Sequence, residues 1–304
     1  MEKKIYASSG SCLDEGHGYR VFSVFNTLLL IVILFATAYP VYFVLIASIS
    51  DPQKMVANYG LMWVPHFPLS VASYRMVVKH SLLLSGFRNT FIIVIGGVAI
   101  NMVLTVIGAY MLSLKNSLLR RPIAYLILFT MYFSGGIVPN YLNVKSLGLM
   151  DTLWALILPG AISTYNMLIM RSAISALPDG LMEAAKLDGA SHLQRILNVV
   201  VPLTGATSAV LILYYAVGHW NAWFNASLYI QTPKRYPLQL VLRQVLILGE
   251  VYVMASGLDA GAEIAAAMMI KYALIVVSTA PIMVLYPFLQ RFFVKGVMVG
   301  SMKG

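Results

Sequence analysis

Residues 88–113 read RNTFIIVIGGVAINMVLTVIGAYMLS, an almost unbroken apolar run that begins with an arginine. A helix needs roughly 20 apolar residues to cross the hydrocarbon layer of a membrane. The run lacks the alternation of apolar and polar positions that a transmembrane strand shows. Because a spanning segment must satisfy its own backbone hydrogen bonds, the run predicts a membrane-spanning helix.

The same pattern recurs along the chain. Of the 304 residues, 60% are hydrophobic and only 11% are charged, whereas soluble domains carry roughly 25% charged residues. We therefore expect an all-α, polytopic membrane protein with six transmembrane helices in one transmembrane domain over 21–294, between tails over 1–20 and 295–304. The predicted spans cover about 21–49, 90–114, 122–138, 153–170, 203–218 and 272–294. The first run is too long for the apolar core of a cleavable signal, which is roughly 7–15 residues, so a retained helix is favoured over a signal peptide.

Basic residues beside the spans predict the orientation. The short loop 115–121, KNSLLRR, carries three of them, and short loops rich in Lys and Arg stay in the cytoplasm. Both termini and residues 178–202 are then cytoplasmic, and the long loop 219–271 is outside. The net charge of +10 comes from basic residues at the ends of apolar runs, where they meet lipid headgroups. It does not indicate a nucleic-acid partner.

Residues 238–256 leave two alternatives open. The segment is apolar enough for a seventh span, which would place the C-terminus outside. Arg243 and Glu250 oppose that alternative, because a charge at mid-membrane costs at least roughly 2.5–3.5 kcal/mol. An amphipathic helix on the outer surface is therefore favoured.

A compact charged segment, 178–190, interrupts the apolar runs. Pro178 suits the first turn of a helix. Asp179 and Glu183 lie near the N-terminal end of that helix, where the helix dipole favours negative charge. Gly189 can adopt a positive φ and end the helix.

A second helix is predicted directly afterwards. Ser191 and Gln194 have the spacing of a capping box. Five apolar residues then recur at helical spacing and predict one continuous stripe. They are Leu193, Ile196, Leu197, Val200 and Val201. Pro202 removes a backbone donor and predicts a kink where this helix enters the next span. Residues 178–202 are then either a rigid lever on that span or an amphipathic loop that only anchors at the membrane surface.

The order of residues in this segment matches a known signature. It reads Glu183-Ala184-Ala185, three residues, Gly189, nine residues, and Val199-Val200-Val201-Pro202. This order resembles the EAA–G–I–LP signature of ABC-type importer permeases. Val199 and Val201 depart from the usual Ile and Leu but keep the apolar face.

Other parts of the chain carry the same resemblance. Residues 88–113, 220–243 and 292–304 are similar to carbohydrate permeases of the MalG type. Residues 133–163 resemble more narrowly the branch that imports complex oligosaccharides cut from acidic polysaccharides. The likeness covers nearly the whole chain and implies a permease of the bacterial inner membrane.

The resemblance implies a role for the charged segment. Residues 178–202 would be a coupling loop whose helix docks in a cleft on a cytoplasmic ATPase subunit, with Glu183 paired to a basic group there. The residues assigned to ATPase coupling are Glu183, Ala184, Ala185, Asp188, Gly189 and Pro202. The implied partners are a second permease, two ABC ATPase subunits, an extracellular solute-binding protein and the lipid bilayer.

No cofactor or metal is expected in this chain. The sequence contains no G-x-x-x-x-G-K-[ST] phosphate loop, so ATP and Mg are expected on the partner ATPases and the chain is not expected to be an enzyme. The one cysteine, Cys12, and the scattered histidines show no metal-ligand spacing.

A few polar and aromatic residues in or beside the spans are candidates for the substrate path. They are Asn101, Tyr165, Asn166, Trp220 and Asn221. Polar groups at membrane depth usually face the interior of a helix bundle, where they contact a substrate or bond neighbouring helices. For the tryptophan, an aromatic belt at the membrane surface is the alternative.

The expected function is import of an oligosaccharide, such as a uronate-containing fragment of alginate or pectin type. An ABC importer for another solute is the nearest alternative. A secondary transporter is a more distant one, because no inverted repeat is visible and no acidic residue falls inside the first five spans.

Overall fold

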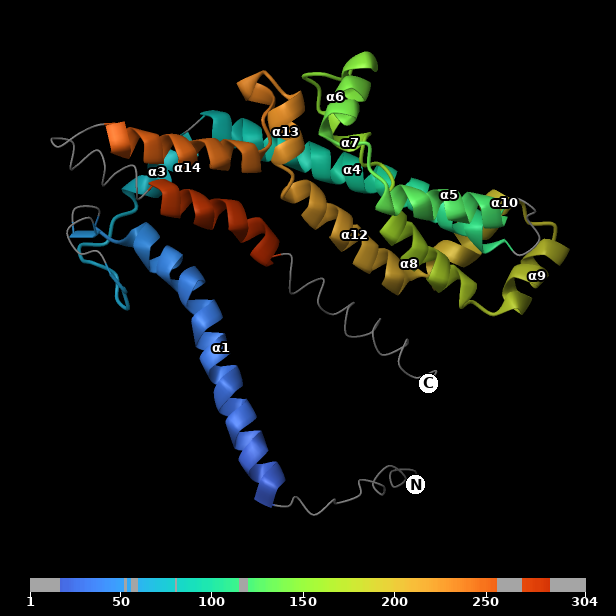
Figure 1. The fold of residues 1–304 in the computed structure, drawn as a ribbon, viewed down its shortest axis with the longest axis horizontal. Helices are drawn as coiled ribbons and strands as arrows, with labels where there is room; N and C mark the ends of the chain where they lie inside the picture. The colour runs from blue at the N-terminus through green and yellow to red at the C-terminus, as the bar shows by residue number, and fades with distance from the viewer. Residues whose placement is uncertain are drawn as a thin grey trace.

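A computed structural model describes residues 17–51, 54–55, 60–79, 81–114, 120–255 and 270–284. Within these ranges every regular element is a helix (Figure 1), which confirms the all-α prediction. The tail predicted over 295–304, most of the tail over 1–20 and most of the loop 115–121 lie outside the described residues.

The long helix α4 (Ser81–Ser113) is the axis of the bundle. Its 33 residues correspond to a length of about 50 Å. It packs against α8 (Thr164–Ser175), α12 (Gly205–Trp220) and α14 (Leu238–Ala255). Small residues allow these close contacts. A Cβ atom on Gly86 would lie 3.2 Å from the Leu238 Cα in α14, and one on Gly108 would lie 2.6 Å from the Met167 Sδ in α8.

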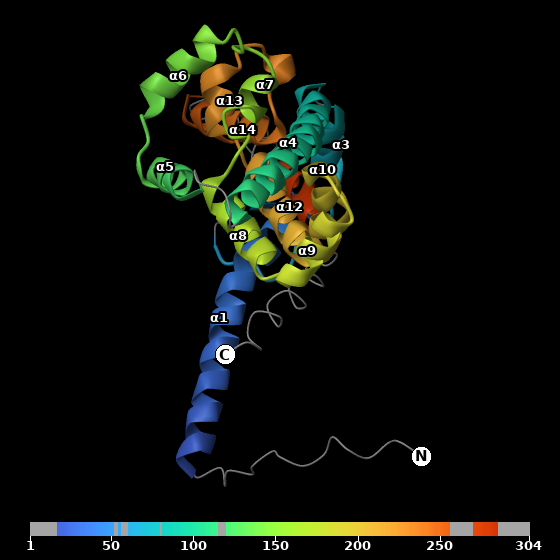
Figure 2. The same cartoon turned by 90° about the vertical axis from the view of Figure 1, so that its right-hand side faces the viewer.

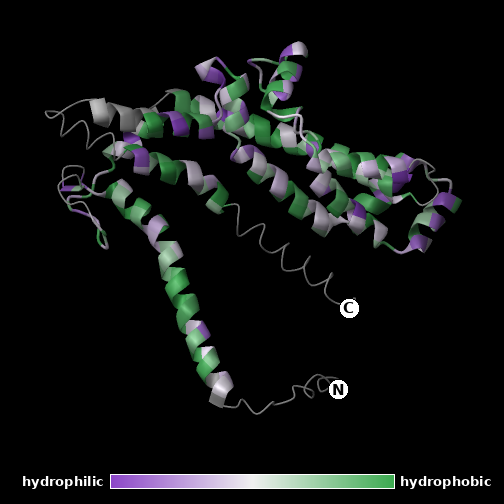
Figure 3. Cartoon of the chain, viewed as in Figure 1, coloured by the Kyte–Doolittle hydropathy of each residue, from purple (hydrophilic) through white to green (hydrophobic). Residues whose placement is uncertain are grey.

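Helix α1 (His17–Ile49) differs from the rest of the bundle because it stands apart from it. Both ribbon views show it running away from the other helices (Figures 1 and 2). Its exposed side chains are mainly apolar, and the hydropathy colouring of Figure 3 marks most of the helix as hydrophobic. Only its C-terminal end is packed, where Ile46 and Ala47 are buried together with Met62.

Two of the described helices, over Val21–Ile49 and Leu82–Ser113, are long and apolar enough to cross a membrane. The number rises to four if each of two sharply bent helix pairs counts as one span. The prediction of one continuous helix over 122–138 is wrong. Helix α5 (Arg120–Tyr132) ends early, and α6 (Ile137–Ser146) follows at a bend of 114°. Gly136, at a φ of 91°, adopts a conformation that other residues resist.

The continuous helix predicted over 153–170 is also wrong. A single turn, α7 (Trp154–Ile157), precedes a break, and α8 begins only at Thr164. Pro159 and Gly160 lie in the break, where one lacks a backbone donor and the other weakens a helix. The Asn101 side chain of α4 donates to the carbonyls of Gly160 and Ala161 at 2.8 and 3.0 Å. The break is therefore held by a neighbouring helix.

The remaining elements lie at the two ends of α4. Near its N-terminal half are α3 (Ala72–Lys79), α13 (Phe224–Tyr229), the short helix η2 (Pro233–Arg235) and the helix Ile270–Val284, which is the described part of the last predicted span. Helices α9 (Asp179–Leu187) and α10 (His192–Arg195) lie at its C-terminal end (Figure 1). The charged segment 178–190 is therefore separated along α4 from α13 and η2.

Candidate functional site

Helix α9 is presented at the end of the bundle. None of its residues is buried, and Leu187 is 88% exposed. Only Met182 packs against the core cluster that includes Tyr110, Met170 and Val200. The opposite face, with the exposed Glu183 and Ala184, is not covered by any described part of the chain.

A Schellman motif ends α9. The Ala190 N–H donates to the Ala185 carbonyl at 3.0 Å, and the Gly189 N–H donates to the Lys186 carbonyl at 3.1 Å. The motif requires a left-handed residue at its centre, and Gly189 has a φ of 75°. The predicted helix end at Gly189 is confirmed.

The predicted capping box at the start of α10 is also confirmed. The Ser191 N–H donates to the Gln194 Oε1 at 2.7 Å, and the Gln194 N–H donates to the Ser191 Oγ at 3.3 Å. Hydrogen bonds therefore fix both the end of α9 and the start of α10, and the turn between the two helices has a defined geometry.

After α10 the helix changes its winding. Ile196–Val200 forms a π-helical turn, followed by the short α11 (Val201–Leu203) and a bend of 87° into α12. The kink predicted at Pro202 is confirmed. The continuous apolar stripe is wrong, because only Ile196 and Val200 are buried, whereas the other three members are exposed. A wider turn shifts residues away from the spacing that would align them.

A tyrosine–histidine pair joins α10 to α4. The hydroxyl of the buried Tyr110 lies 2.9 Å from the Nδ1 of His192, and the two rings meet edge to face at 5.8 Å. Arg195 lies nearby with a buried Nε that has no partner among the described residues. Sequence reasoning missed this pair, since 82 positions separate its members.

The substrate-path candidates do not form one site. Asn101 is fully buried, and its oxygen lies 2.8 Å from the Nε2 of His219 in α12. Asn101 donates both of its amide protons to backbone carbonyls, so its side chain stabilises the packing of neighbouring segments. Nearby, the Tyr215 hydroxyl lies 2.7 Å from the Thr105 Oγ1 and accepts from the Ser163 N–H at 3.2 Å.

The other candidates are scattered. Trp220 is 4% exposed, and its indole N–H has no partner among the described residues. Asn166 is buried and Tyr165 is exposed. The Asn221 amide donates to the Val217 carbonyl at 3.0 Å and so closes the end of α12.

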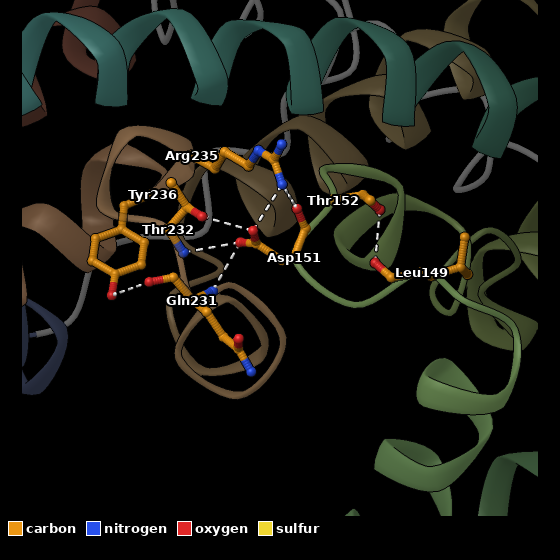
Figure 4. A network of polar contacts seen from close by, with 7 residues as sticks. All are labelled: Leu149, Asp151, Thr152, Gln231, Thr232, Arg235 and Tyr236. Carbon is orange, nitrogen blue, oxygen red and sulfur yellow. Dashed lines mark hydrogen bonds and ion pairs between the residues drawn. The ribbon is translucent and has the colours of Figure 1, made fainter.

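A polar network that the sequence did not reveal lies near the other half of α4. We call it the outer network, because the orientation predicted from the sequence places its loops outside; it consists of Asp151, Gln231, Thr232 and Arg235 (Figure 4). The Asp151 carboxylate accepts from the Gln231 N–H at 3.0 Å, from the Thr232 N–H at 2.9 Å and from the Thr232 hydroxyl at 2.7 Å. Arg235 adds an ion pair at 2.8 Å and also donates to the Asp151 carbonyl.

The geometry of Asp151 explains its electrostatics. Its φ of 56° is a left-handed conformation that Asp tolerates better than most residues. The hydrogen bonds from Thr232, together with the Gln231 N–H and the Arg235 charge, lower the pKa of this carboxyl to about 2. The network is anchored to α4 by Asn89, whose amide donates to the Lys234 carbonyl at 2.9 Å.

Known proteins resemble this chain over most of its length. The polygalacturonan/rhamnogalacturonan transport system permease protein YtcP of Bacillus subtilis (strain 168) is 36% identical over 270 residues, which cover 87% of this chain and 92% of the relative. Protein LplC of the same organism is 37% identical over 285 residues, with coverage of 94% and 96%.

A solved structure and a family description agree with these relatives. A chain from the crystal structure of a bacterial ABC transporter involved in the import of the acidic polysaccharide alginate matches with a TM-score of 0.82 and 27% identity. The match covers 91% of this chain and 98% of that one. Residues 105–299 match the description "Binding-protein-dependent transport system inner membrane component". The predicted family is confirmed: the chain belongs to the binding-protein-dependent transport system inner membrane components, the permease subunits of ABC transporters.

Proposed function

We propose that this permease subunit imports an acidic oligosaccharide and that residues 178–202, the coupling loop, connect it to the partner ATPases. The observation that carries the coupling role is the exposure of α9. A helix of nine residues without one buried side chain is too short to be stable alone, yet both of its ends are fixed by the surrounding turns. Such a helix is suited to docking in a partner.

The α9 surface has the chemistry of a protein contact. The exposed Leu187 offers apolar area, and Glu183, Lys186 and Asp188 surround it with charge of both signs. An apolar centre with a polar rim is typical of protein interfaces. Glu183 is the residue that we expect to pair with a basic group of the ATPase.

Two routes lead from the coupling loop into the bundle. One passes through the π-helical turn and the bend at Pro202 into α12. The other is the hydrogen bond between His192 and Tyr110 of α4. A displacement of α9 would therefore move both α4 and α12. ATP and Mg belong to the partner ATPases in this proposal, since the sequence lacks a phosphate loop.

The proposed orientation places the coupling loop in the cytoplasm and the outer network outside, with both termini inside. Asn89 and Tyr110 contact these two regions and are 21 residues apart on α4, or about 32 Å. This distance is close to the hydrocarbon thickness of roughly 30 Å. The two regions therefore suit opposite membrane surfaces.

The substrate class is supported by the relatives. One is named for polygalacturonan and rhamnogalacturonan, and the matching structure belongs to a transporter of the acidic polysaccharide alginate. The exposed Arg88, Lys145 and Lys234 in the outer half of this chain would attract an anionic sugar by long-range electrostatics.

Reconstitution tests the proposed function. The chain, its partner permease, both ATPases and the solute-binding protein are placed in proteoliposomes with trigalacturonate. We expect ATP-dependent uptake, which is lost with Glu183→Lys while the protein stays in the membrane. Glu2→Lys is the matched charge control and should transport normally. Wild-type uptake by the Glu183→Lys complex would contradict the coupling role.

Orientation is tested in intact cells with a Cys12→Ser background. A cysteine introduced by Leu187→Cys should be protected from an impermeant thiol reagent, whereas one introduced by Lys234→Cys should react. Both positions are exposed in this chain without its partners. Labelling is therefore compared in cells that lack the partner ATPases, so that accessibility depends on the side of the membrane. The opposite labelling pattern would reverse the proposed orientation.

A further inference from the structure

A cavity of about 410 Å³ lies beside the outer network. Its walls come from α4, from the segment Thr152–Ile157 and from η2, and are formed by Ile92, Gly96, Thr152, Leu153, Trp154, Ile157 and Arg235. Small-molecule sites usually measure roughly 300–1,000 Å³ and combine apolar walls with a few polar groups. This cavity has that size and that composition.

Two of the lining side chains are suited to a sugar acid. Trp154 is 53% exposed and offers a large, rigid aromatic surface for the apolar face of a sugar ring. Arg235 is the one charged residue among the lining residues, and its side chain is 51% exposed. A guanidinium binds a carboxylate through two parallel hydrogen bonds when one of its edges is available.

The outer network positions this guanidinium. One terminal nitrogen of Arg235, Nη1, donates to the carboxylate and the carbonyl of Asp151. Among the described residues, Nε and the other terminal nitrogen have no protein partner. These two nitrogens form one edge of the guanidinium, the edge that can receive a carboxylate in bidentate fashion.

Asp151 pairs with only one side of the Arg235 guanidinium. Its carboxylate contacts Nη1 and is also stabilised by hydrogen bonds from Gln231 and Thr232. Arg235 retains positive character toward the cavity, while its orientation is fixed. A pre-oriented charged group loses less conformational freedom on binding a ligand.

We propose that the cavity between Trp154 and Arg235 is a binding subsite for one uronate unit of the transported oligosaccharide. The proposal rests on the acidic oligosaccharide proposed above as substrate. The Arg235 guanidinium holds the uronate carboxylate, and Trp154 covers the sugar ring. The subsite lies in the outer half of the permease, since Gly96 in its wall precedes Tyr110 by 14 residues of α4, or about 21 Å.

Direct binding tests the subsite. The complex of both permeases and both ATPases is placed in nanodiscs without the binding protein, so that only the permease selects the ligand. Fluorescently labelled trigalacturonate and its methyl ester are the probes. Arg235→Gln should raise the Kd for the acid at least tenfold and leave the Kd for the ester within twofold. Trp154→Ala should weaken both probes, and Trp154→Phe should restore most of the binding.

Two variants separate carboxylate binding from loop stability. Asp151→Asn keeps the Arg235 charge but removes the carboxylate that orients it, so it should weaken acid binding less than Arg235→Gln does and leave ester binding within twofold. Arg121→Gln removes an exposed charge that does not line the cavity and should leave both values within twofold. An equal loss of acid and ester binding in Arg235→Gln would reduce Arg235 to a structural role and overturn the subsite.

The wild-type result separates this inference from the proposed function. If the complete importer transports trigalacturonate but the nanodisc complex does not bind it, the subsite is wrong and the substrate class stands. If the complete importer transports no oligouronate, the substrate class itself is wrong, and the subsite falls with it. Displacement of both probes alike by added phospholipid would mean that a lipid chain occupies the cavity, and would also overturn the subsite.

Discussion

The two ends of α4 are held in different ways. At one end, a single side-chain hydrogen bond among the described residues, from Tyr110, reaches the coupling loop, and α9 beyond it has no buried residue. At the other end, the Asp151 carboxylate collects four donors from a loop about 80 residues away, and Asn89 ties that loop to α4. In the proposed function, the coupling end moves with a partner, whereas the outer end is held in place by these hydrogen bonds.

The strongest test of this contrast uses two glycines with the same backbone geometry. Gly189 in the coupling loop and Gly148 near the outer network have φ values of 75° and 67°, and a Cβ atom added to either one would meet no other atom within 4 Å. Valine at either site costs about 1–2 kcal/mol of backbone strain. We expect Gly189→Val to lower uptake at least tenfold and Gly148→Val to lower it about twofold, with both chains inserted.

The readout is sugar uptake and ATP hydrolysis by the reconstituted importer, normalised to the amount of chain in the membrane. A similar loss of uptake in both glycine variants would show that strain alone, and not the position of α9, determines the effect. In that case the coupling loop would be no more sensitive than an ordinary turn.

A smaller effect is expected from the link between α10 and α4. Tyr110→Phe removes one hydroxyl and keeps the aromatic contact with His192, so it costs about 1 kcal/mol. Uptake per ATP hydrolysed should fall about threefold. His192→Phe should give the same loss, and the double variant should lose no more than either one. Additive losses would mean that the two residues act independently.

The outer network gives the next prediction, which concerns pH. The folded-state pKa of Asp151, about 2, is below its unfolded value of about 4. Its contribution to the free energy of unfolding is therefore fully present above pH 4 and is lost as the pH falls toward 2. Thermal unfolding in detergent should separate wild type from Asp151→Asn by on the order of 1 kcal/mol at pH 6, after solvent screening.

This difference between wild type and Asp151→Asn should shrink steadily between pH 4 and pH 2. Tyr110→Phe is the control, because it leaves every carboxylate unchanged and its stability difference should persist between pH 4 and pH 2. If the stability difference between wild type and Asp151→Asn stays constant down to pH 2, the ion pair does not account for the rigidity of the outer end.

The smallest effect is expected at the start of α10. Ser191→Ala removes the hydroxyl that accepts from the Gln194 N–H and costs about 1 kcal/mol of local helix stability. Because Gly189 still fixes the turn between α9 and α10, uptake should fall less than twofold. Ser191→Thr should behave as wild type. A tenfold loss would mean that the capping box, and not the glycine, holds α9 in place.

Local features of the coupling loop could be predicted from the sequence. The Schellman motif at Gly189 and the capping box at Ser191 each depend on residues within five positions. Such hydrogen bonds are dictated by nearby residue types. The kink after Pro202 follows from the missing backbone donor in the same way.

Features that depend on distant contacts could not be predicted. Residues 153–170 are predicted to form a span because of their apolar composition. Pro159 and Gly160 interrupt the helix, and Asn101 stabilises the break from another helix. Asn101 itself was correctly expected to lie inside the bundle, but its partner His219 is 118 positions away. Asp151 and Arg235 are 84 positions apart and form no local pattern.

The π-helical turn Ile196–Val200 has a consequence for how this chain can change in length. A π turn holds one more residue than an α turn without breaking the helix. Deletion of one residue here would leave an ordinary α-helix, so it would be structurally mild at the site itself. Because an α turn makes nearly the same rotation with one residue fewer, α9 would keep its direction relative to α12. The turn therefore absorbs a change of one residue in the length of this segment, and the direction of the helix proposed to dock is preserved.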